Sequence, residues 1–326
     1  MESLSGPARS RKQRLWYILV YVSLVPFLIS LRFPAASGSG AAVFPEASAA
    51  PAPVVPAEST APAVRTFSLT GTDTISLLLV GQDRDSQQAQ GRSDAIVLCT
   101  LHRSRQQLIL TSFLRDLYVS IPGYENNRIN AAFAYGGAPL LSRTLEENFG
   151  VRPDGWLVVD FSGFSKIVDT LGGVALELTR EEAEDINQKC SGALTQGRNL
   201  LSGREALAYV RIRKLDADGD FSRTVRQQKL LEAILEAGKS SSAATLLTLL
   251  RQVLPLVETD LTTGQLLRLA PEVLSMLPQL QLQKQQIPEP DTFTYETIRG
   301  MSVLVPDLEK ARKALEDTLQ PQKEAR

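Results

Sequence analysis

Three short apolar runs in the first half of the chain constrain the fold more than any other feature. They cover residues 75–80, 95–101 and 108–113. Each has the length of a buried strand, and short connections between strands favour antiparallel neighbours. In such a meander the end of the first strand, the start of the second and the end of the third lie at one edge. Asp83, Asp94 and Arg115 are therefore expected to converge there.

Two carboxylates at one edge of a sheet repel each other, which raises the pKa of one of them unless a cation lies between them. A hard divalent ion, magnesium or manganese in its place, completed by water and phosphate oxygens, is the natural partner for Asp83 and Asp94. The alternative is that each aspartate merely ends a strand, as is common for aspartate beside glycine. The residues alone leave both interpretations open.

Residues 209–228 (YVRIRKLDADGDFSRTVRQQ) form a second informative segment, in which arginines alternate with aspartates. As an extended segment, Tyr209, Arg211 and Arg213 share one face. A helix is predicted to begin just after Asp220, because apolar residues beyond it recur at helical spacing.

Arg223 and Gln227 continue the inward apolar stripe of that helix at its N-terminal end. The end of a helix offers free N–H groups and a positive dipole, and the planar forks of arginine suit phosphate oxygens. The segment therefore indicates an anion site. The alternative is a solvated charged loop with local ion pairs.

Strand and helix patterns alternate in the remainder of the chain, and Ser202 and Glu205 form a capping box before Tyr209. The expected strands are 156–160 and 174–178, with edge strands at 283–287 and 301–305; the expected helices are 139–149, 162–171, 246–256, 263–269 and 308–319. The predicted fold class is α/β, an α-β-α sandwich with a central mixed, largely antiparallel sheet flanked by helices.

The N-terminal region predicts a membrane attachment. Residues 1–14 are basic and are expected in the cytoplasm, and residues 15–33 contain an unbroken apolar run that suits a transmembrane signal anchor. Residues 34–66 are rich in alanine, proline and serine and suit an extended extracellular linker. The alternative for the apolar run is a cleaved signal peptide.

Composition excludes some classes of function. A net charge of -1 argues against a general nucleic-acid binder, which is usually basic. The single histidine, His102, makes histidine-based catalysis and histidine-ligated zinc unlikely explanations of the chain.

Several motifs, in this order and spacing, resemble the LytR-CpsA-Psr family of cell-wall glycopolymer ligases of Gram-positive bacteria. They are LLLVGQD (77–83), GRSDAIVL (91–98), SFLRDLYVSIPG (112–123), RINAAFAYGG (128–137), VDTLGGV (168–174) and the arginine-rich segment within 201–228. Leu114 and Arg128 depart from the family, which often has proline and lysine there. The resemblance implies a catalytic domain at 67–326, with core motifs in 67–240 and a C-terminal completion in 241–326.

The family implies a reaction in which a teichoic acid, a capsular or a related polysaccharide is moved from a polyprenyl-diphosphate carrier to a peptidoglycan sugar hydroxyl. The product is a phosphodiester, polyprenyl phosphate is released, and magnesium assists. The implied location is the cell membrane, with a single span and the catalytic domain outside. The implied partners are the lipid-linked glycan, peptidoglycan and membrane lipid, and no nucleic acid.

Carried over by motif, Asp83 and Asp94 resemble the magnesium-binding aspartates of the family. The residues that resemble its diphosphate-binding set are Arg115, Arg211, Arg213, Arg223 and Gln227, with Arg84 and Asp220 expected in the same site. Catalytic roles are expected for both aspartates, for Asp220 and for Arg115, Arg211, Arg213 and Arg223. Two alternatives remain: a diphosphatase using the same site, and a membrane-tethered protein that is regulatory or only binds the wall.

Overall fold

The structure is a computed structural model, and it describes residues 73–83, 92–212 and 220–319. The predicted membrane helix, the linker, Arg84 and Arg213 lie outside these residues and stay predictions. The backbones of Asp83 and Asp220 are described, but their side chains are not. Among the helices of the described ranges, none has the length and apolar character needed to cross a membrane.

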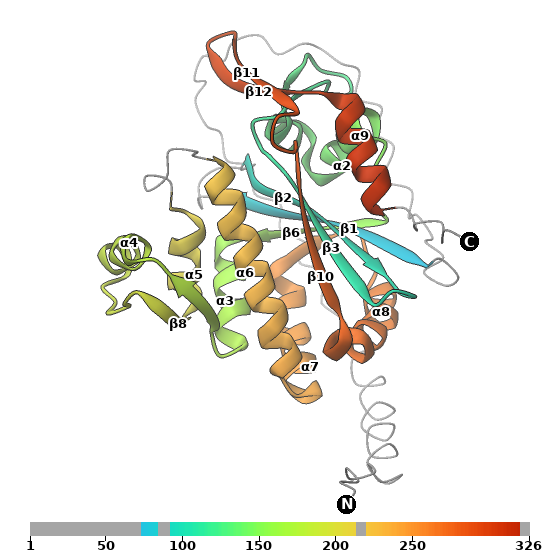
Figure 1. The fold of residues 1–326 in the computed structure, drawn as a ribbon. Coiled ribbons are helices and arrows are strands. Elements are labelled where there is room, and N and C mark those ends of the chain that lie inside the picture. Colours follow the sequence, from blue (N-terminus) through green and yellow to red (C-terminus); the bar gives the residue numbers. More distant parts are fainter. Residues whose placement is uncertain (1–72, 84–91, 213–219, 320–326) are drawn as a thin grey trace, which may run out of the picture. The chain divides into compact units, whose positions relative to one another are not determined.

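A six-stranded mixed sheet forms the centre of the described part, in the order β10-β3-β2-β1-β6-β9 (Figure 1). Its strands are β1 (Thr74–Asp83), β2 (Arg92–His102), β3 (Gln107–Phe113), β6 (Gly155–Asp160), β9 (Val257–Thr259) and β10 (Gln281–Ile287). β1, β2 and β3 form the predicted antiparallel meander. Because β6 runs parallel to β1 and β10 runs parallel to β3, the sheet is mixed, as predicted.

Helices cover both faces of this sheet, because side chains alternate along each strand. Leu78 and Leu98 are paired across β1 and β2 and pack into one core with α2 (Ile129–Phe149) and α9 (Leu308–Leu319). Leu79 and Val97, the next pair, face α3 (Phe161–Thr170), α5 (Gly203–Val210) and α6 (Asp220–Ser240). The predicted arrangement of a sheet between helices is confirmed for the described residues.

Smaller elements complete the two helical layers. β7 (Val174–Leu178) pairs with β8 (Gly197–Leu201) beside α4 (Arg180–Cys190), and these pack with α3, α5 and α6 in a second core. α7 (Ala243–Val253), α8 (Thr263–Met276) and the 3-10 turns η1 (Leu254–Leu256) and η2 (Leu277–Gln279) lie in the part predicted to be mainly helical. Leu101 of β2 packs there against Met276 and Leu277.

The prediction that Tyr209 and Arg211 belong to an extended segment is wrong. α5 opens with the predicted capping box at Ser202 and continues past Tyr209, and Arg211 occupies its C-cap. Tyr209 is fully buried in the second core, whereas Arg211 is exposed. The helix therefore buries the ring of Tyr209 and leaves Arg211 exposed. This difference in burial decides the local structure against the strand-like alternation of the sequence.

The strand predicted at 301–305 exists, but it is not an edge of the main sheet. β11 (Phe293–Ile298) and β12 (Met301–Pro306) form a separate antiparallel hairpin. Its turn residues, Arg299 and Gly300, have φ values of 52° and 74°, and positive φ at both central positions matches the twist of paired strands. The N–H of Leu304 donates to the carbonyl of Asp116 at 3.0 Å, which attaches the hairpin beside the end of β3.

The helix predicted at 139–149 is the second half of a longer element. α2 begins at Ile129 after the short pair β4 (Tyr118–Val119) and β5 (Asn127–Arg128). Its backbone leaves helical geometry at Gly136 and Gly137, and Pro139 follows this break. Proline is tolerated in the first turn after such a break, because the backbone N–H that it lacks would have no carbonyl partner within the helix.

The contact between α3 and α5 depends on Gly203. A Cβ atom at this position would lie 2.0 Å from the backbone oxygen of Ser165, and the Gly203 N–H donates to the Asp169 carboxylate at 2.7 Å. We expect Gly203→Ala to lower the free energy of unfolding by about 2 kcal/mol or more, because overpacking against backbone forces α5 to move. Urea unfolding followed by circular dichroism measures this.

Gly264→Ala is the matched control, since a Cβ there meets nothing closer than 4.0 Å and the position lies in the first turn of α8. This variant should be as stable as the wild type or more so, because alanine favours helix more than glycine does. Equal unfolding midpoints for Gly203→Ala and the wild type would contradict the tight α3–α5 contact.

Candidate active site

Asp94 is the extra residue of a bulge in β2. In the pairing of β1 with β2, Gly81 lies opposite Ala95 and Gln82 lies opposite Ser93, so Asp94 is one residue more than β1 supplies at this point. A bulge bends the strand and redirects a side chain, and bulges are frequent beside active sites. The bulge explains how an aspartate can leave the regular alternation of β2 and point toward the helices α6 and α3.

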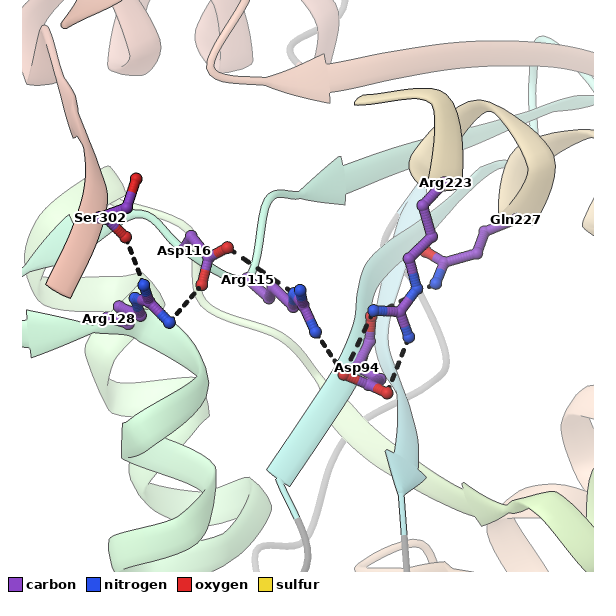
Figure 2. A network of polar contacts seen from close by, with 7 residues as sticks. All are labelled: Asp94, Arg115, Asp116, Arg128, Arg223, Gln227 and Ser302. Atoms are coloured by element: carbon purple, nitrogen blue, oxygen red, sulfur yellow. Dashed lines mark hydrogen bonds and ion pairs between the residues drawn. The ribbon is translucent and has the colours of Figure 1, made fainter. Parts of the chain in front are cut away.

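Two arginines from distant segments bind the Asp94 carboxylate (Figure 2). Arg223 of α6 donates hydrogen bonds from its two terminal guanidinium nitrogens, one to Oδ2 at 2.7 Å and one to Oδ1 at 3.4 Å. Arg115, just after β3, donates to Oδ1 at 3.0 Å. Only 5% of the Arg223 side chain and 10% of the Asp94 side chain are exposed. The predicted convergence of Asp94 and Arg115 is thus present, with Arg223 added to it.

Gln227, one turn after Arg223 in α6, completes the contacts of the bulge. Its side-chain Nε2 donates to the backbone carbonyl of Asp94 at 3.3 Å. This carbonyl belongs to the extra residue of the bulge, and a hydrogen bond to a partly buried carbonyl favours the folded state. Gln227 therefore stabilises the bulge itself.

The charge of Asp94 is maintained by the arginines. Burial raises the pKa of its carboxyl group, but the hydrogen bonds and charges of Arg223 and Arg115 outweigh burial, and the net pKa lies below the ordinary value. The Nε of Arg223 makes no hydrogen bond within the described part of the chain. Both terminal nitrogens of this guanidinium donate to Asp94, and the Nε itself is buried.

A largely apolar pocket of about 260 Å³ opens between the sheet and the helices α3, α5 and α6. Its polar residues are Asp94, Asp160, Arg211, Arg223 and Gln227. Its apolar lining is Leu79, Val80, Ala95, Val97, Val159, Phe161, Phe164, Ile167, Leu207, Val210, Leu230, Leu231 and Ile234, with Gly81. The inward stripe predicted for the helix after Asp220 is confirmed for Arg223, Gln227, Leu230, Leu231 and Ile234, which line this pocket. Leu235, the last residue of the predicted stripe, packs instead in the core around Met276 and Leu277.

Arg211 reaches the pocket from the C-terminal end of α5. Its guanidinium carbon lies 4.6 Å from the centre of the Phe161 ring, at the start of α3. A guanidinium over an aromatic face is attracted by the ring and keeps its N–H edge available. The exposed Arg211 is therefore oriented without an acidic partner in this contact.

A second row of charges leads away from Asp94 on the side opposite to α6 (Figure 2). The Asp116 carboxylate lies 3.8 Å from Nε of Arg115 and 3.2 Å from a guanidinium nitrogen of Arg128. Arg128 also donates to the backbone carbonyl of Ser302 in β12. Arginine and aspartate thus alternate from α6 to the hairpin, and Asp116 holds Arg115 in place.

The metal site at Asp83 and Asp94 stays a prediction. Asp83 ends β1 and pairs with Arg92, two positions before Asp94, so its backbone lies at the expected edge. Within the described side chains there is no cluster of three or more histidine, cysteine, aspartate or glutamate residues suited to a metal. Magnesium ordinarily uses only one or two carboxylates and takes its other ligands from water and substrate phosphates. Of these two aspartates, Asp94 is the one whose side chain is described, and its two oxygens accept hydrogen bonds from Arg115 and Arg223.

Several residues of this region were not anticipated from the sequence. Asp116, Phe161 and the apolar lining of the pocket are the main ones. Phe161 follows Asp160, which pairs with Gln82 in the parallel β1–β6 ladder. A parallel strand ending in Asp-Phe beside β1 was a usable signal, because strand ends of parallel neighbours lie at the same edge.

Arg226, although it lies between Arg223 and Gln227, points elsewhere. Its Nε donates to Glu182 at 2.8 Å, and both side chains are less than 10% exposed. The other oxygen of Glu182 accepts the backbone N–H of Thr179 in the capping box of α4. Arg226 thus joins α6 to α4 and is a structural residue.

Comparison with known proteins places this geometry among relatives. A family model described as the LytR_cpsA_psr family matches residues 48–319. "Regulatory protein MsrR" of Staphylococcus aureus is 37% identical over 160 residues, which are 49% of this chain and 48% of MsrR. The polyisoprenyl-teichoic acid–peptidoglycan teichoic acid transferase TagT of Bacillus subtilis is 37% identical over 180 residues, 53% of this chain and 55% of TagT.

A solved structure of the LytR-CPS2A-psr family protein YwtF (TagT) with bound octaprenyl pyrophosphate lipid has a similar fold. Its TM-score is 0.60 at 28% identity, over 78% of this chain and 95% of that chain. The matched segments span about half the length of the curated relatives MsrR and TagT. The names of those relatives differ, one being a regulator and the other a transferase.

The buried pair of Arg226 and Glu182 generates a stability prediction. We expect Arg226→Ala to lower the free energy of unfolding by about 3–5 kcal/mol, because it leaves Glu182 as an uncompensated buried charge. The measurement is urea unfolding. Arg180→Ala is the control in the same helix as Glu182: Arg180 forms an exposed ion pair with Glu184, and its loss should leave the midpoint unchanged. Similar midpoints for both variants would refute the structural role of Arg226.

Proposed function

We propose that this chain, which belongs to the LytR-CpsA-Psr family, is a phosphotransferase that moves a glycopolymer from a polyprenyl-diphosphate carrier to a sugar hydroxyl of peptidoglycan. The polymer would be a teichoic acid, a capsular polysaccharide or a related glycan. One observation carries the proposal: an apolar pocket ends at Asp94, Arg211, Arg223 and Gln227. A polyprenyl diphosphate has matching parts: a long apolar chain that suits the apolar lining, and a charged diphosphate that suits the arginines.

The relatives support this choice of ligand. TagT is named as a teichoic acid transferase, and a solved structure of TagT, whose fold is similar, holds an octaprenyl pyrophosphate. MsrR, which has the same 37% sequence identity to this chain as TagT, is named as a regulatory protein. The names alone therefore do not select an activity, and the proposal depends on the pocket and its arginines.

The arginines would bind the diphosphate and neutralise the charge that develops on it. Phosphoryl transfer depends mainly on positioning and on charge stabilisation. Arg223 is fixed by Asp94, Arg115 is fixed by Asp94 and Asp116, and Arg211 is oriented by Phe161. Such fixed donors need little rearrangement when the substrate binds. Arg84, Arg213, Gln227 and Asp220 are proposed members of the same site.

Asp83 and Asp94 would hold magnesium, or manganese, beside the diphosphate. When bound, the ion would neutralise charge on the phosphate oxygens and orient them. Asp94 is suited to this role because its pKa is lowered and the carboxylate is ionised at neutral pH. Arg115 and Arg223 keep this carboxylate directed at the pocket.

In the proposed reaction, a sugar hydroxyl oxygen bonds to the phosphorus that carries the glycan. The bond from that phosphorus to the oxygen bridging the two phosphates breaks, and polyprenyl phosphate leaves with the bonding electrons and the equivalent of the hydroxyl proton. The glycan and the acceptor are then joined by a phosphodiester. The predicted anchor at 15–33 would keep this reaction at the outer face of the cell membrane.

The test is turnover by the full-length chain supplied with a synthetic polyprenyl-diphosphate glycan, peptidoglycan oligomers and Mg²⁺. Arg211→Ala should lower kcat by at least about 100-fold, because it removes a donor that stabilises transition-state charge. Asp94→Ala and addition of EDTA should also abolish joining. Mass spectrometry of the joined glycan and of released polyprenyl phosphate measures each step.

Arg198→Ala provides the control, because Arg198 is an exposed arginine of β8 that does not line the pocket. Its activity should equal that of the wild type. Metal-dependent release of polyprenyl phosphate without joining would replace the proposal by a diphosphatase. Unchanged turnover in Arg211→Ala would show that the pocket does not hold the diphosphate.

A further inference from the structure

Three aromatic side chains form a row that the proposed diphosphate site does not use. The rings of Phe221 and Phe293 are stacked with centroids 5.3 Å apart, and Tyr295 meets Phe293 edge to face at 5.2 Å. Tyr295, on β11, is 67% exposed. We call Phe221, Phe293 and Tyr295 the aromatic row. An exposed ring held by ring neighbours is a pre-formed contact surface, and such surfaces often mark a binding site.

The aromatic row is connected to the proposed site at both of its ends. Phe221 lies in the first turn of α6, the helix that carries Arg223. The hairpin that carries Tyr295 is attached to the Arg115 side, because Leu304 donates to the carbonyl of Asp116 and Arg128 donates to the carbonyl of Ser302. A ligand on the row would therefore extend along the arginine–aspartate network toward Arg115.

Arg223 and Arg115 reach Asp94 from different sides. Arg223 and Gln227 approach Asp94 from α6 and line the apolar pocket. Arg115 approaches from the other side and leads through Asp116 and Arg128 to Ser302 of β12, as Figure 2 shows. None of these last four residues is among those that line the pocket.

This placement matters because of the geometry of phosphoryl transfer. The attacking oxygen and the leaving oxygen lie roughly in line on opposite sides of the phosphorus. In the proposed reaction the leaving group is polyprenyl phosphate, whose apolar chain would occupy the pocket. The hydroxyl that attacks must then come from the side away from the pocket, which is the side of Arg115 and the hairpin.

The chemistry of the hairpin surface suits a saccharide. The C–H face of a sugar packs on an aromatic ring, and its hydroxyl groups need polar partners nearby. Thr297 is exposed on the same strand face as Tyr295, whereas Thr294 and Glu296 are exposed on the other face of β11. Within the described strands β11 pairs with β12 alone, so the N–H and C=O groups of its outer edge are open to hydrogen bonds.

We infer that the β11–β12 hairpin binds the acceptor glycan strand, with Tyr295 stacking on a sugar ring a short distance from the hydroxyl that attacks. This inference rests on the proposed transfer reaction. The occupant is the acceptor rather than the glycan of the donor, because the in-line geometry places the acceptor opposite the lipid.

The test measures binding of uncrosslinked peptidoglycan glycan oligosaccharides to the full-length chain by isothermal titration calorimetry, without lipid and without Mg²⁺. Tyr295→Ala should weaken binding about tenfold, the loss expected for one aromatic contact. Tyr295→Trp should retain the affinity, because it keeps an aromatic face. In turnover, Tyr295→Ala should raise the KM for the acceptor and leave kcat at saturating acceptor nearly unchanged.

Tyr124→Ala is the matched control. Tyr124 is also exposed and stacked on another ring, that of Tyr135 in α2, at 4.7 Å, and its loss should not alter glycan binding. Equal glycan affinity of Tyr295→Ala and the wild type would overturn the inference. It would also be overturned if Tyr295→Ala weakened binding of the lipid-linked donor and left binding of the acceptor glycan unchanged. Glycan binding is measured without turnover, so it tests the hairpin even if the transfer reaction of the proposed function is not observed.

Discussion

The ion pairs of Asp94 with Arg223 and Arg115 are the interaction on which the rest of the site depends. A guanidinium as buried as that of Arg223 is tolerated only with a well-placed counter-charge. Asp94 supplies it because a bulge turns the residue out of the regular ladder, and Gln227 donates a hydrogen bond to its backbone carbonyl. Sheet, helix α6 and the segment after β3 are therefore fixed relative to one another by one carboxylate, and the pocket between them takes its shape from the same contacts.

Much of this arrangement could be predicted from the sequence, because it follows from local rules. Short connections between apolar runs made the meander and brought Asp94 near Arg115. Helical spacing after Asp220 placed Arg223 and Gln227 on the inward face of α6. The family resemblance, carried by motifs within 77–228, agreed with the matching family model. The roles of all the site residues remain predictions, and the side chains of Asp83, Arg84, Arg213 and Asp220 are not among those described.

The errors and omissions arise where tertiary contacts decide. Tyr209 and Arg211 alternate as in a strand, yet burial of the Tyr209 ring in the second core kept them in α5 and at its cap. The bulge at Asp94 left no sign in the spacing of residues. Phe221 and Phe293 meet only after folding, so no local pattern joins them. The strand at 301–305 went to a hairpin because the Arg299-Gly300 turn offered a nearer partner than the main sheet.

The bulge also has an evolutionary consequence. Gly81 is paired with Ala95 and Gln82 with Ser93, so the two parts of the β1–β2 ladder are out of step by one residue, and that residue is Asp94. Loss of its single codon would bring the two parts into continuous register without moving any other pair. A lineage could thus discard the carboxylate and keep the sheet intact in one genetic event. The same deletion would leave the buried guanidinium of Arg223 without its counter-charge, so a descendant that lost Asp94 would also have to replace Arg223.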